Sequence, residues 1–224
     1  MAIKKGHRRT KRNRRALVLK ILRERIVDGY YPQGMKLVEQ ELAEEFKMSR
    51  PMLREILADL DSQGLVEKKP NRGTTVRRID SESLLEIMEI REVLEGLAAR
   101  LAAQKTKPDD WRDLDSAFGD PAEKMVANME FEKYLDLVAK LRERMVESAG
   151  NNELSKLIYS LFAKITVVQR RIVILPGRIE EAINEHRQVH KALIDGDPDK
   201  AEKMKRLNLR NARRCLEKYK SYVS

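Results

Sequence analysis

Arg50 and Arg54 stand one helical turn apart at the start of the stretch KMSRPMLREILADLDSQGLV, residues 47–66. Ser49 before them suits the N-cap of a helix, and the apolar residues that follow recur at helical spacing. Guanidinium groups at the exposed start of a helix can bind a guanine edge through two hydrogen bonds or hold a phosphate. An ordinary amphipathic helix with a solvated charged end has the same pattern, so the neighbouring segments decide between the two interpretations.

Few other side chains in the sequence could support catalysis. The chain has three histidines and one cysteine, Cys215, and it has neither a phosphate-binding loop nor a nucleophile motif. A single cysteine excludes an internal disulfide and a cysteine-based zinc site. We therefore expect no enzyme. The basic first residues lack the apolar segment of a secretory signal, and no apolar run is long enough to span a bilayer, so we expect a cytoplasmic protein.

The excess positive charge is confined to the first third of the chain. Residues 1–78 contain 20 Lys and Arg against 10 Asp and Glu, whereas residues 79–224 contain 26 of each kind. A basic module that meets a polyanion, joined to a neutral module with another task, would explain this division. Low Gly and Pro with abundant Leu, Glu, Lys and Arg indicates a mainly helical fold.

The segments around the two arginines have the pattern of a winged helix-turn-helix. Residues 1–15 form a basic arm without apolar periodicity, which we expect to be disordered in isolation yet able to track DNA phosphates. Helices are predicted at 15–28 and 39–46, and the short link KMS joins the second to the helix that begins after Ser49. Two β-prone runs, LVEKK and TTVRRI, flank the turn PNRG and predict a two-stranded wing.

Residues 17–79 resemble the DNA-binding domain of the GntR family of bacterial transcription regulators. The family pattern is seen at Pro32, Gly34, Leu42-Ala43, Ser49-Arg50, Arg54-Glu55, Leu60, Gly64-Leu65 and Gly73. By this resemblance Arg50 and Arg54, with Ser49 beside them, contact bases and nearby phosphates. The wing tip at Arg72 and Gly73 would enter the minor groove.

The sequence departs from the family pattern next to these contacts. Gln40 stands where many relatives have an arginine at the start of the second helix, and we count Gln40 among the expected DNA contacts. Pro51 and Met52 replace the usual Thr-Pro or Thr-Thr. These changes bear on which operator sequence is bound, not on the activity.

The remaining residues predict a helical bundle. The stretches IREVLEGLAARLAA, GNNEL and NEHRQVHKALIDGD resemble landmarks of the FCD domain, the all-helical effector module of one GntR branch. The resemblance implies an antiparallel bundle of roughly six or seven helices. Five helical segments are visible in the sequence, at 79–105, 121–148, 152–175, 178–195 and 198–220. We expect Trp111, and the apolar stripe from Leu154 to Ile172, to serve packing in the core or between subunits.

Many FCD domains hold a divalent metal with one Asp and three His, and the resemblance places these ligands at Val138, Arg142, His186 and Asn208. Only His186 could be a strong ligand, because a valine cannot coordinate and a guanidinium repels a cation. We therefore expect no metal and no other cofactor. His190 lies one turn after His186, but the other aligned positions offer this pair neither a carboxylate nor a further histidine. A metal-dependent regulator using His186 is the less favoured alternative.

Arginine at position 142 suggests a different ligand chemistry. A metal in this pocket typically holds a carboxylate ligand, and Arg142 could hold a carboxylate directly by two parallel hydrogen bonds. His186 and Asn208 would add donors, and Val138 would form part of the apolar wall. The alternative is that Arg142 pairs with an internal acid or points to solvent and the pocket is vestigial.

Arg91, on the opening helix of the bundle, is a further candidate contact of the effector. It could face the same pocket, although an intrahelical pair with Glu95, four residues on, is favoured. We include Arg91 in the expected effector site.

These observations predict three parts: a basic arm at 1–15, a winged helix-turn-helix domain at 16–79, and an FCD-like ligand-binding and dimerisation domain at 80–224. We expect a transcription regulator, by default a repressor, that binds double-stranded DNA at a palindromic operator as a homodimer. Its effector would be an organic acid. A less specific architectural protein that binds nucleic acid through its basic arm is the alternative.

Overall fold

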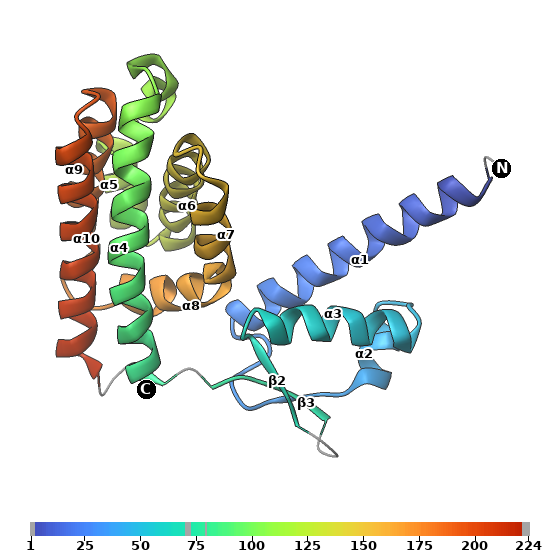
Figure 1. Cartoon of the computed structure of the whole chain (residues 1–224). Coiled ribbons are helices and arrows are strands. Elements are labelled where there is room, and N and C mark those ends of the chain that lie inside the picture. Colours follow the sequence, from blue (N-terminus) through green and yellow to red (C-terminus); the bar gives the residue numbers. More distant parts are fainter. Residues whose placement is uncertain (1–2, 70–72, 79, 221–224) are drawn as a thin grey trace. The chain divides into compact units, whose positions relative to one another are not determined.

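The structure, a computed structural model, describes residues 3–69, 73–78 and 80–220 (Figure 1). The chain divides into two compact units, Met1–Ile79 and Asp80–Ser224. Each unit has its own buried apolar core. The predicted fold class, mainly helical with a winged helix-turn-helix followed by an all-helical bundle, is confirmed.

The described part of the first unit consists of three helices and a small sheet. Its helices are α1 (Ile3–Val27), α2 (Glu39–Glu45) and α3 (Arg50–Ser62), and its strands are β1 (Lys36–Leu37), β2 (Val66–Lys69) and β3 (Gly73–Val76). β3 lies between β1 and β2 and pairs antiparallel with both. The prediction of a two-stranded wing missed β1, which is too short to show the alternation of a strand.

Helix α1 begins earlier than the sequence indicated. It starts at Ile3, so the predicted start at Arg15 was wrong, and the described residues of the basic arm are helical. Lys and Arg are good helix formers, so local propensity permits a helix where apolar periodicity predicts none. Leu17 was expected on the buried stripe but is 56% exposed, whereas Val18 and Leu22 are buried.

Helix α3 is held by its apolar face. Leu53, Ile56 and Leu60 are fully buried, and each such side chain contributes roughly 1.5–3 kcal/mol on burial. Ser49 takes the N-cap position with an extended backbone, but its side chain accepts no hydrogen bond from the helix. The helix ends at Ser62, and Gly64 just beyond its C-cap has a φ of 69°, which suits a residue without a side chain, so the predicted stop at this glycine is confirmed.

The second unit is a bundle of helices, α4 to α10. They are α4 (Ser81–Lys105), α5 (Asp120–Ala127), α6 (Phe131–Ser148), α7 (Asn152–Ser160), α8 (Phe162–Val173), α9 (Arg178–Ile194) and α10 (Pro198–Lys218), with short 3-10 turns η1 (Pro108–Asp110) and η2 (Arg112–Leu114) after α4. None of the described helices of the chain is long and apolar enough to cross a membrane.

Two predicted helices of this unit are each broken in two. The segment 121–148 is interrupted before α6, where Met129 has a φ of 58°. The segment 152–175 is interrupted at Leu161, between α7 and α8. Neither break contains the Gly or Pro that marks a helix end in a sequence. Apolar periodicity alone therefore predicted one helix where the structure has two.

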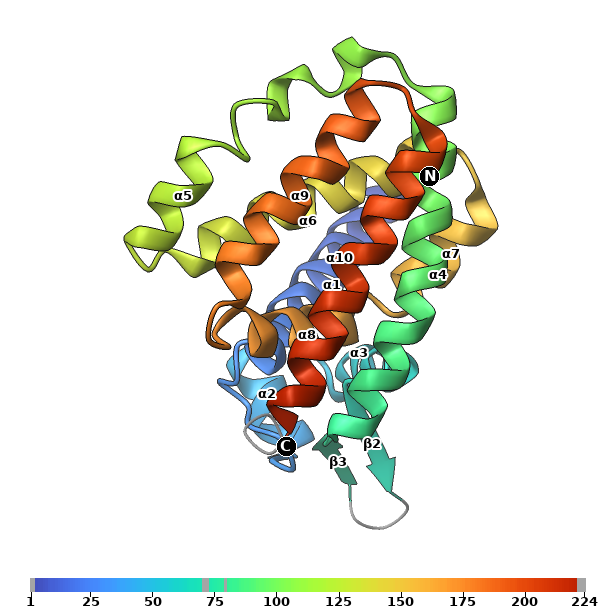
Figure 2. The same cartoon turned by 90° about the vertical axis from the view of Figure 1, so that its left-hand side faces the viewer.

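Helix α10 packs against both α4 and α9, and Figure 2 shows it between them. The core of the unit gathers around Trp111, Phe118, Tyr134 and Met145, all nearly inaccessible to solvent. The Trp111 indole Nε1 donates to Thr106 Oγ1 at 2.8 Å, so the packing role expected for this residue is confirmed. Polar residues of α4, α9 and α10 face one another inside this bundle.

Candidate functional site

Arg50 and Arg54 project from the first turns of α3, and their side chains are 58% and 54% exposed. Both approach one carboxylate at the start of α2. Arg54 Nε donates to Glu39 Oε2 at 2.7 Å, and Arg50 Nη2 lies 3.9 Å from the same oxygen. An exposed ion pair contributes at most about 1 kcal/mol, so both guanidinium groups can exchange this carboxylate for a phosphate or a base.

The other residues predicted to contact DNA lie on three elements. Ser49 is exposed at the start of α3, and Gln40 is exposed on α2, where its Nε2 donates to Glu44 Oε1 at 3.2 Å. Gly73 is exposed at the first position of β3 with a φ of 84°, at the wing tip. Arg72 lies outside the described residues.

Helix α1 contributes a contact that the sequence did not reveal. Arg14 Nη2 donates to the backbone carbonyl oxygens of Phe46 and Lys47 at 2.9 and 2.8 Å. These two residues follow α2, and Lys47 has a φ of 47°, which is uncommon for a residue with a side chain. Arg14 therefore holds the turn that sets the direction of α3.

A cavity of about 60 Å³ lies in the second unit, lined by residues of α4, α6, α8, α9 and α10. This volume suits a few water molecules or the head group of a small ligand. Much of the wall is apolar. The lining residues that carry charges or hydrogen-bonding groups are Arg91, Tyr134, Gln169, Arg178, His186, Lys205 and Asn208.

Four of the five residues predicted to bind an effector line this cavity, namely Arg91, Val138, His186 and Asn208. Arg142 is buried but is not among the lining residues that the structure describes. Its Nη1 donates at 2.8 Å to Oε1 of Gln169, which does line the cavity. Arg142 therefore reaches the cavity through Gln169, and the direct contact predicted with a bound carboxylate would need Gln169 to move.

Glu95 is fully buried and lies between two cations. Its Oε1 accepts a hydrogen bond from Arg91 Nε at 2.7 Å, which confirms the predicted intrahelical pair. Its Oε2 lies 2.9 Å from Lys205 Nζ as an ion pair without hydrogen-bond geometry. Burial alone would raise the pKa of the Glu95 carboxyl, but the charges of Arg91 and Lys205 outweigh it and hold this pKa well below its usual value.

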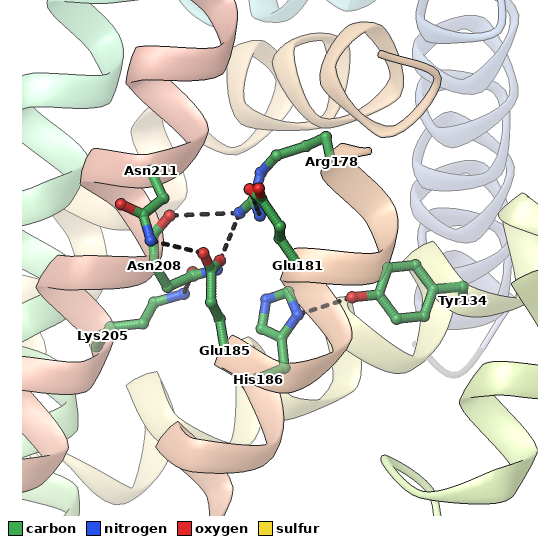
Figure 3. Close-up of polar contacts among 8 residues, drawn as sticks. All are labelled: Tyr134, Arg178, Glu181, Glu185, His186, Lys205, Asn208 and Asn211. Carbon is green, nitrogen blue, oxygen red and sulfur yellow. Dashed lines mark hydrogen bonds and ion pairs between the residues drawn. The ribbon is translucent and has the colours of Figure 1, made fainter. Parts of the chain in front are cut away.

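Arg178, at the start of α9, is held by a second carboxylate (Figure 3). Its Nη2 donates to Glu185 Oε2 at 2.6 Å, and the same oxygen accepts from Asn208 Nδ2 at 2.8 Å. Glu185 Oε1 accepts from Asn211 Nδ2 at 2.8 Å. Arg178 Nη1 is buried without a hydrogen-bond partner among the described residues and lies 3.9 Å from Oε2 of the exposed Glu181.

His186 is a neutral group of the cavity wall. Its Nδ1 shares a hydrogen bond of 2.9 Å with the Tyr134 hydroxyl (Figure 3). Burial, together with the charges of Lys205 and Arg178, lowers the pKa of His186 well below its usual value, so its ring is uncharged at pH 7. Burial also raises the pKa of Tyr134, so its phenol stays protonated.

His190 does not join His186 in one site. Its Nε2 makes a hydrogen bond of 3.0 Å with the backbone oxygen of Trp111, on the side of the η1 and η2 turns. Across the residues that the structure describes, no group of three or more His, Cys, Asp or Glu side chains is arranged to hold a metal ion. The lining therefore offers hydrogen-bond donors and positive charge rather than a set of metal ligands.

The charges around the cavity do not balance. Three cations line it, Arg91, Arg178 and Lys205, and the carboxylates of Glu95 and Glu185 pair with them. Glu181, the third carboxylate near these cations, is exposed to water. With His186 neutral, the buried groups of the cavity therefore carry an excess of one positive charge, and a buried excess of this sign favours an anion.

Sequence reasoning missed Arg178, Lys205 and Glu185. Lys205 lies one helical turn before Asn208, and Glu185 directly precedes His186, so proximity to predicted positions was the available signal. Arg178 had none. The spacing of charged residues along a helix does not distinguish a buried cation from a solvated one.

Comparison with known proteins identifies both units. Residues 15–76 match the family model described as bacterial regulatory proteins, gntR family, and residues 86–211 match the FCD domain. The chain is 28% identical over 180 residues to a probable D-xylose utilization operon transcriptional repressor of Paenarthrobacter nicotinovorans, a match that covers 79% of this chain and 77% of the relative. It is 26% identical over 202 residues to a galactonate operon transcriptional repressor of Escherichia coli, covering 81% and 87%.

Solved structures show the same fold. The structure of E. coli McbR/YncC aligns with a TM-score of 0.76 over 92% of this chain and 97% of that chain, at 21% identity. A GntR-type regulator from Rhodococcus sp. RHA1 aligns with a TM-score of 0.72 over 92% and 99%, also at 21% identity.

Proposed function

The chain belongs to the GntR family of bacterial regulatory proteins and carries an FCD domain, and we propose that it represses transcription by binding a two-fold symmetric DNA operator. Its family makes it a transcription regulator and not an enzyme. Two of its relatives are by name operon repressors, which supports repression as the mode of action. It would act in the cytoplasm of a bacterium.

The DNA contacts would come from the start of α3 and from the wing. Arg50 and Arg54 are more than half exposed, and among the described residues the acid they approach is Glu39 near the surface, so both are available to base edges and phosphates. Ser49 and Gln40 lie near them, and Gly73, with Arg72 beside it in the sequence, would bring the wing to the minor groove.

The effector would be a small organic acid bound in the cavity of the FCD domain. The excess of buried positive charge carries this proposal, because it favours a negatively charged ligand over a neutral or positively charged one. His186 and Asn208 offer polar groups, Val138 apolar wall, and Arg91 and Arg178 positive charge. One relative is a repressor of a galactonate operon, and galactonate is itself a carboxylate.

The protein would act as a homodimer, because a two-fold symmetric operator needs two copies of α3. Helix α4 offers a surface for a second copy, since Ile90, Val93 and Leu97 recur on one face and are 48%, 52% and 37% exposed. We expect Val93→Glu to give a monomer in analytical ultracentrifugation, whereas wild-type protein sediments as a dimer. A monomeric wild-type protein would contradict the proposal.

Selection from random DNA tests operator binding. We expect the wild-type protein to enrich a palindromic sequence, and Arg54→Ala to lose that enrichment. Enrichment without any shared motif would favour an architectural role instead.

A thermal-shift screen of organic acids tests the effector. A ligand that binds only the folded protein raises its melting temperature, and we expect carboxylates to do so in wild-type protein but not in Arg178→Gln. Stoichiometric transition metal in protein purified without chelators or a metal-affinity tag would instead favour a metal-dependent regulator.

A further inference from the structure

A surface groove lies beside the cavity, between the first half of α9 and the last turns of α10. Its volume is about 520 Å³, and its lining includes Glu185 and Asn211 together with two exposed cations, Arg214 and Lys218. The hydrogen-bond partners of Glu185 on the other side, Arg178 and Asn208, line the cavity. The Glu185 carboxylate therefore forms part of the wall between the groove and the cavity.

Three donors from two helices converge on this one carboxylate (Figure 3). They are Arg178 Nη2 at 2.6 Å, Asn208 Nδ2 at 2.8 Å and Asn211 Nδ2 at 2.8 Å. The Glu185 side chain is only 11% exposed. A guanidinium and two amides around a nearly buried carboxylate form the donor set that a bound organic acid requires.

The Glu185 carboxylate leaves part of this donor set unused. Arg178 Nη1 is buried and has no hydrogen-bond partner among the described residues, so one of the two terminal nitrogens of this guanidinium can still donate to a ligand. A ligand carboxylate could bind both Nη atoms of Arg178 only after Glu185 releases Nη2. The amide of Asn208, a predicted effector contact, is likewise occupied by Glu185.

We infer that Glu185 is an internal substitute for the carboxylate of the effector. On binding, the carboxylate of the effector takes the place of Glu185 on Arg178 and Asn208, and Glu185 turns into the groove, where Arg214 and Lys218 pair with it. The buried charge stays constant, because one carboxylate leaves as another enters. This inference rests on the proposed function and names Glu185 as the residue that moves when the effector binds.

The exchange also supplies an element with two arrangements. Without a ligand, Glu185 ties α9 to α10 through Asn208 and Asn211. With a ligand, these contacts are replaced, and the effector favours the arrangement in which Glu185 has left. Simple addition of an anion to Arg178 Nη1 would leave Glu185 in place and would make it a positioning residue for Arg178.

The Glu185→Gln variant separates exchange from addition. Glutamine has nearly the same shape but holds Arg178 less strongly, so exchange predicts that a carboxylate binds about 10-fold or more tightly to the variant than to wild-type protein. Glu181→Gln is the matched control, because it removes a carboxylate from the same helix and the same groove, near the same arginine. It should change affinity little, since Glu181 lies 3.9 Å from Arg178 Nη1 and is exposed.

Isothermal titration calorimetry with sodium propionate and sodium D-galactonate provides the measurement, with propionamide as the uncharged control. Tighter binding to Glu185→Gln, with Glu181→Gln unchanged, supports exchange. Equal or weaker binding to Glu185→Gln, when wild-type protein binds, overturns this inference and leaves the proposed function standing. Binding of neither carboxylate to wild-type protein or to Glu185→Gln counts against the proposed acid effector and this inference together.

A second measurement covers the case in which the glutamine variant folds poorly. In Glu185→Ala the carboxylate is removed, and sodium acetate should raise the melting temperature of this variant above its value in sodium chloride at equal ionic strength. The same acetate should affect Glu181→Ala no more than wild-type protein. Equal responses of the two alanine variants would show that the three donors do not form a carboxylate site.

Discussion

The two units of the chain contain the same ion pair in opposite environments. Arg54 Nε donates to Glu39 at 2.7 Å on the surface of the first unit, and Arg91 Nε donates to Glu95 at the same distance inside the second. The Arg54 side chain is 54% exposed, whereas Arg91 is 4% and Glu95 0% exposed. The donor–acceptor distance is therefore the same in the two pairs, whereas access of water differs.

This difference assigns the two pairs different tasks. Water screens the surface pair and can replace either partner, so Arg54 can leave Glu39 for DNA at little cost. The buried pair cannot open without leaving a charge in a medium that solvates it poorly. A surface pair thus suits a reversible contact, while a buried pair suits a fixed part of the core.

The largest expected effect is on stability. Glu95→Gln should lower the free energy of unfolding by about 3–5 kcal/mol, because it leaves Arg91 and Lys205 without their buried partner. Glu39→Gln is the matched surface change and should cost no more than about 1 kcal/mol. Urea denaturation measures both. Similar losses of unfolding free energy in the two variants would contradict the expected difference between the buried pair and the surface pair.

The next effect concerns DNA. Arg54→Ala should weaken operator binding by about 1–3 kcal/mol, which is roughly 5-fold to 150-fold, while changing the free energy of unfolding little. Arg112→Ala removes an exposed arginine from the second unit and serves as the control. Fluorescence anisotropy with labelled operator gives the affinities. An unchanged affinity in Arg54→Ala would remove α3 from the interface.

The buried pair should also make stability depend on pH. The pKa of Glu95 is lower in the folded protein than in the unfolded chain, so the pair contributes fully above the unfolded value of about 4.5. Its contribution is lost as pH falls below that value, by about 1.4 kcal/mol for each pH unit.

Denaturation of wild-type protein and Glu95→Gln at several pH values tests this dependence. The difference in unfolding free energy between the two should be constant from pH 7 to 5 and should shrink below pH 4.5. A difference that stays constant down to pH 3 would mean that Glu95 does not keep its charge through Arg91 and Lys205.

The smallest effect is expected at the surface carboxylate. Glu39→Gln removes a negative charge from beside Arg50 and Arg54, so binding to DNA of random sequence should strengthen by about 2-fold to 5-fold. Glu41→Gln, on the same turn of α2, controls for the change in net charge. A loss of affinity in Glu39→Gln would show that Glu39 orients the arginines rather than competes with DNA.

The fold followed from the sequence where apolar periodicity and motifs were both present. Leu53, Ile56 and Leu60 predicted α3, and Gly64 marked its end, because local sequence decides such features. The breaks at Met129 and Leu161 were missed because no Gly or Pro marks them. The strand β1 is defined by its pairing with β3, which a two-residue segment does not reveal.

The two candidate sites also differ in how far the sequence could predict them. The exposed arginines of α3 could be predicted from position alone, since a surface contact depends on few neighbours. The cavity depends on which charged residues of α4, α9 and α10 meet, and tertiary packing decides this. Resemblance therefore led to His186, Asn208 and Val138, which line the cavity. It also led to Arg142, which is not among the described lining residues, whereas Arg178 is.

Operator affinity in the presence of a carboxylate effector found by thermal shift tests most directly whether the charged cavity controls DNA binding by α3. Wild-type protein and Arg178→Gln should bind operator DNA equally well without the effector. With the effector, we expect wild-type protein to lose at least about 5-fold in affinity, the scale of an ordinary allosteric coupling, and Arg178→Gln not to respond. The same response in both proteins, or none in wild-type protein, would contradict control of α3 through the charged cavity.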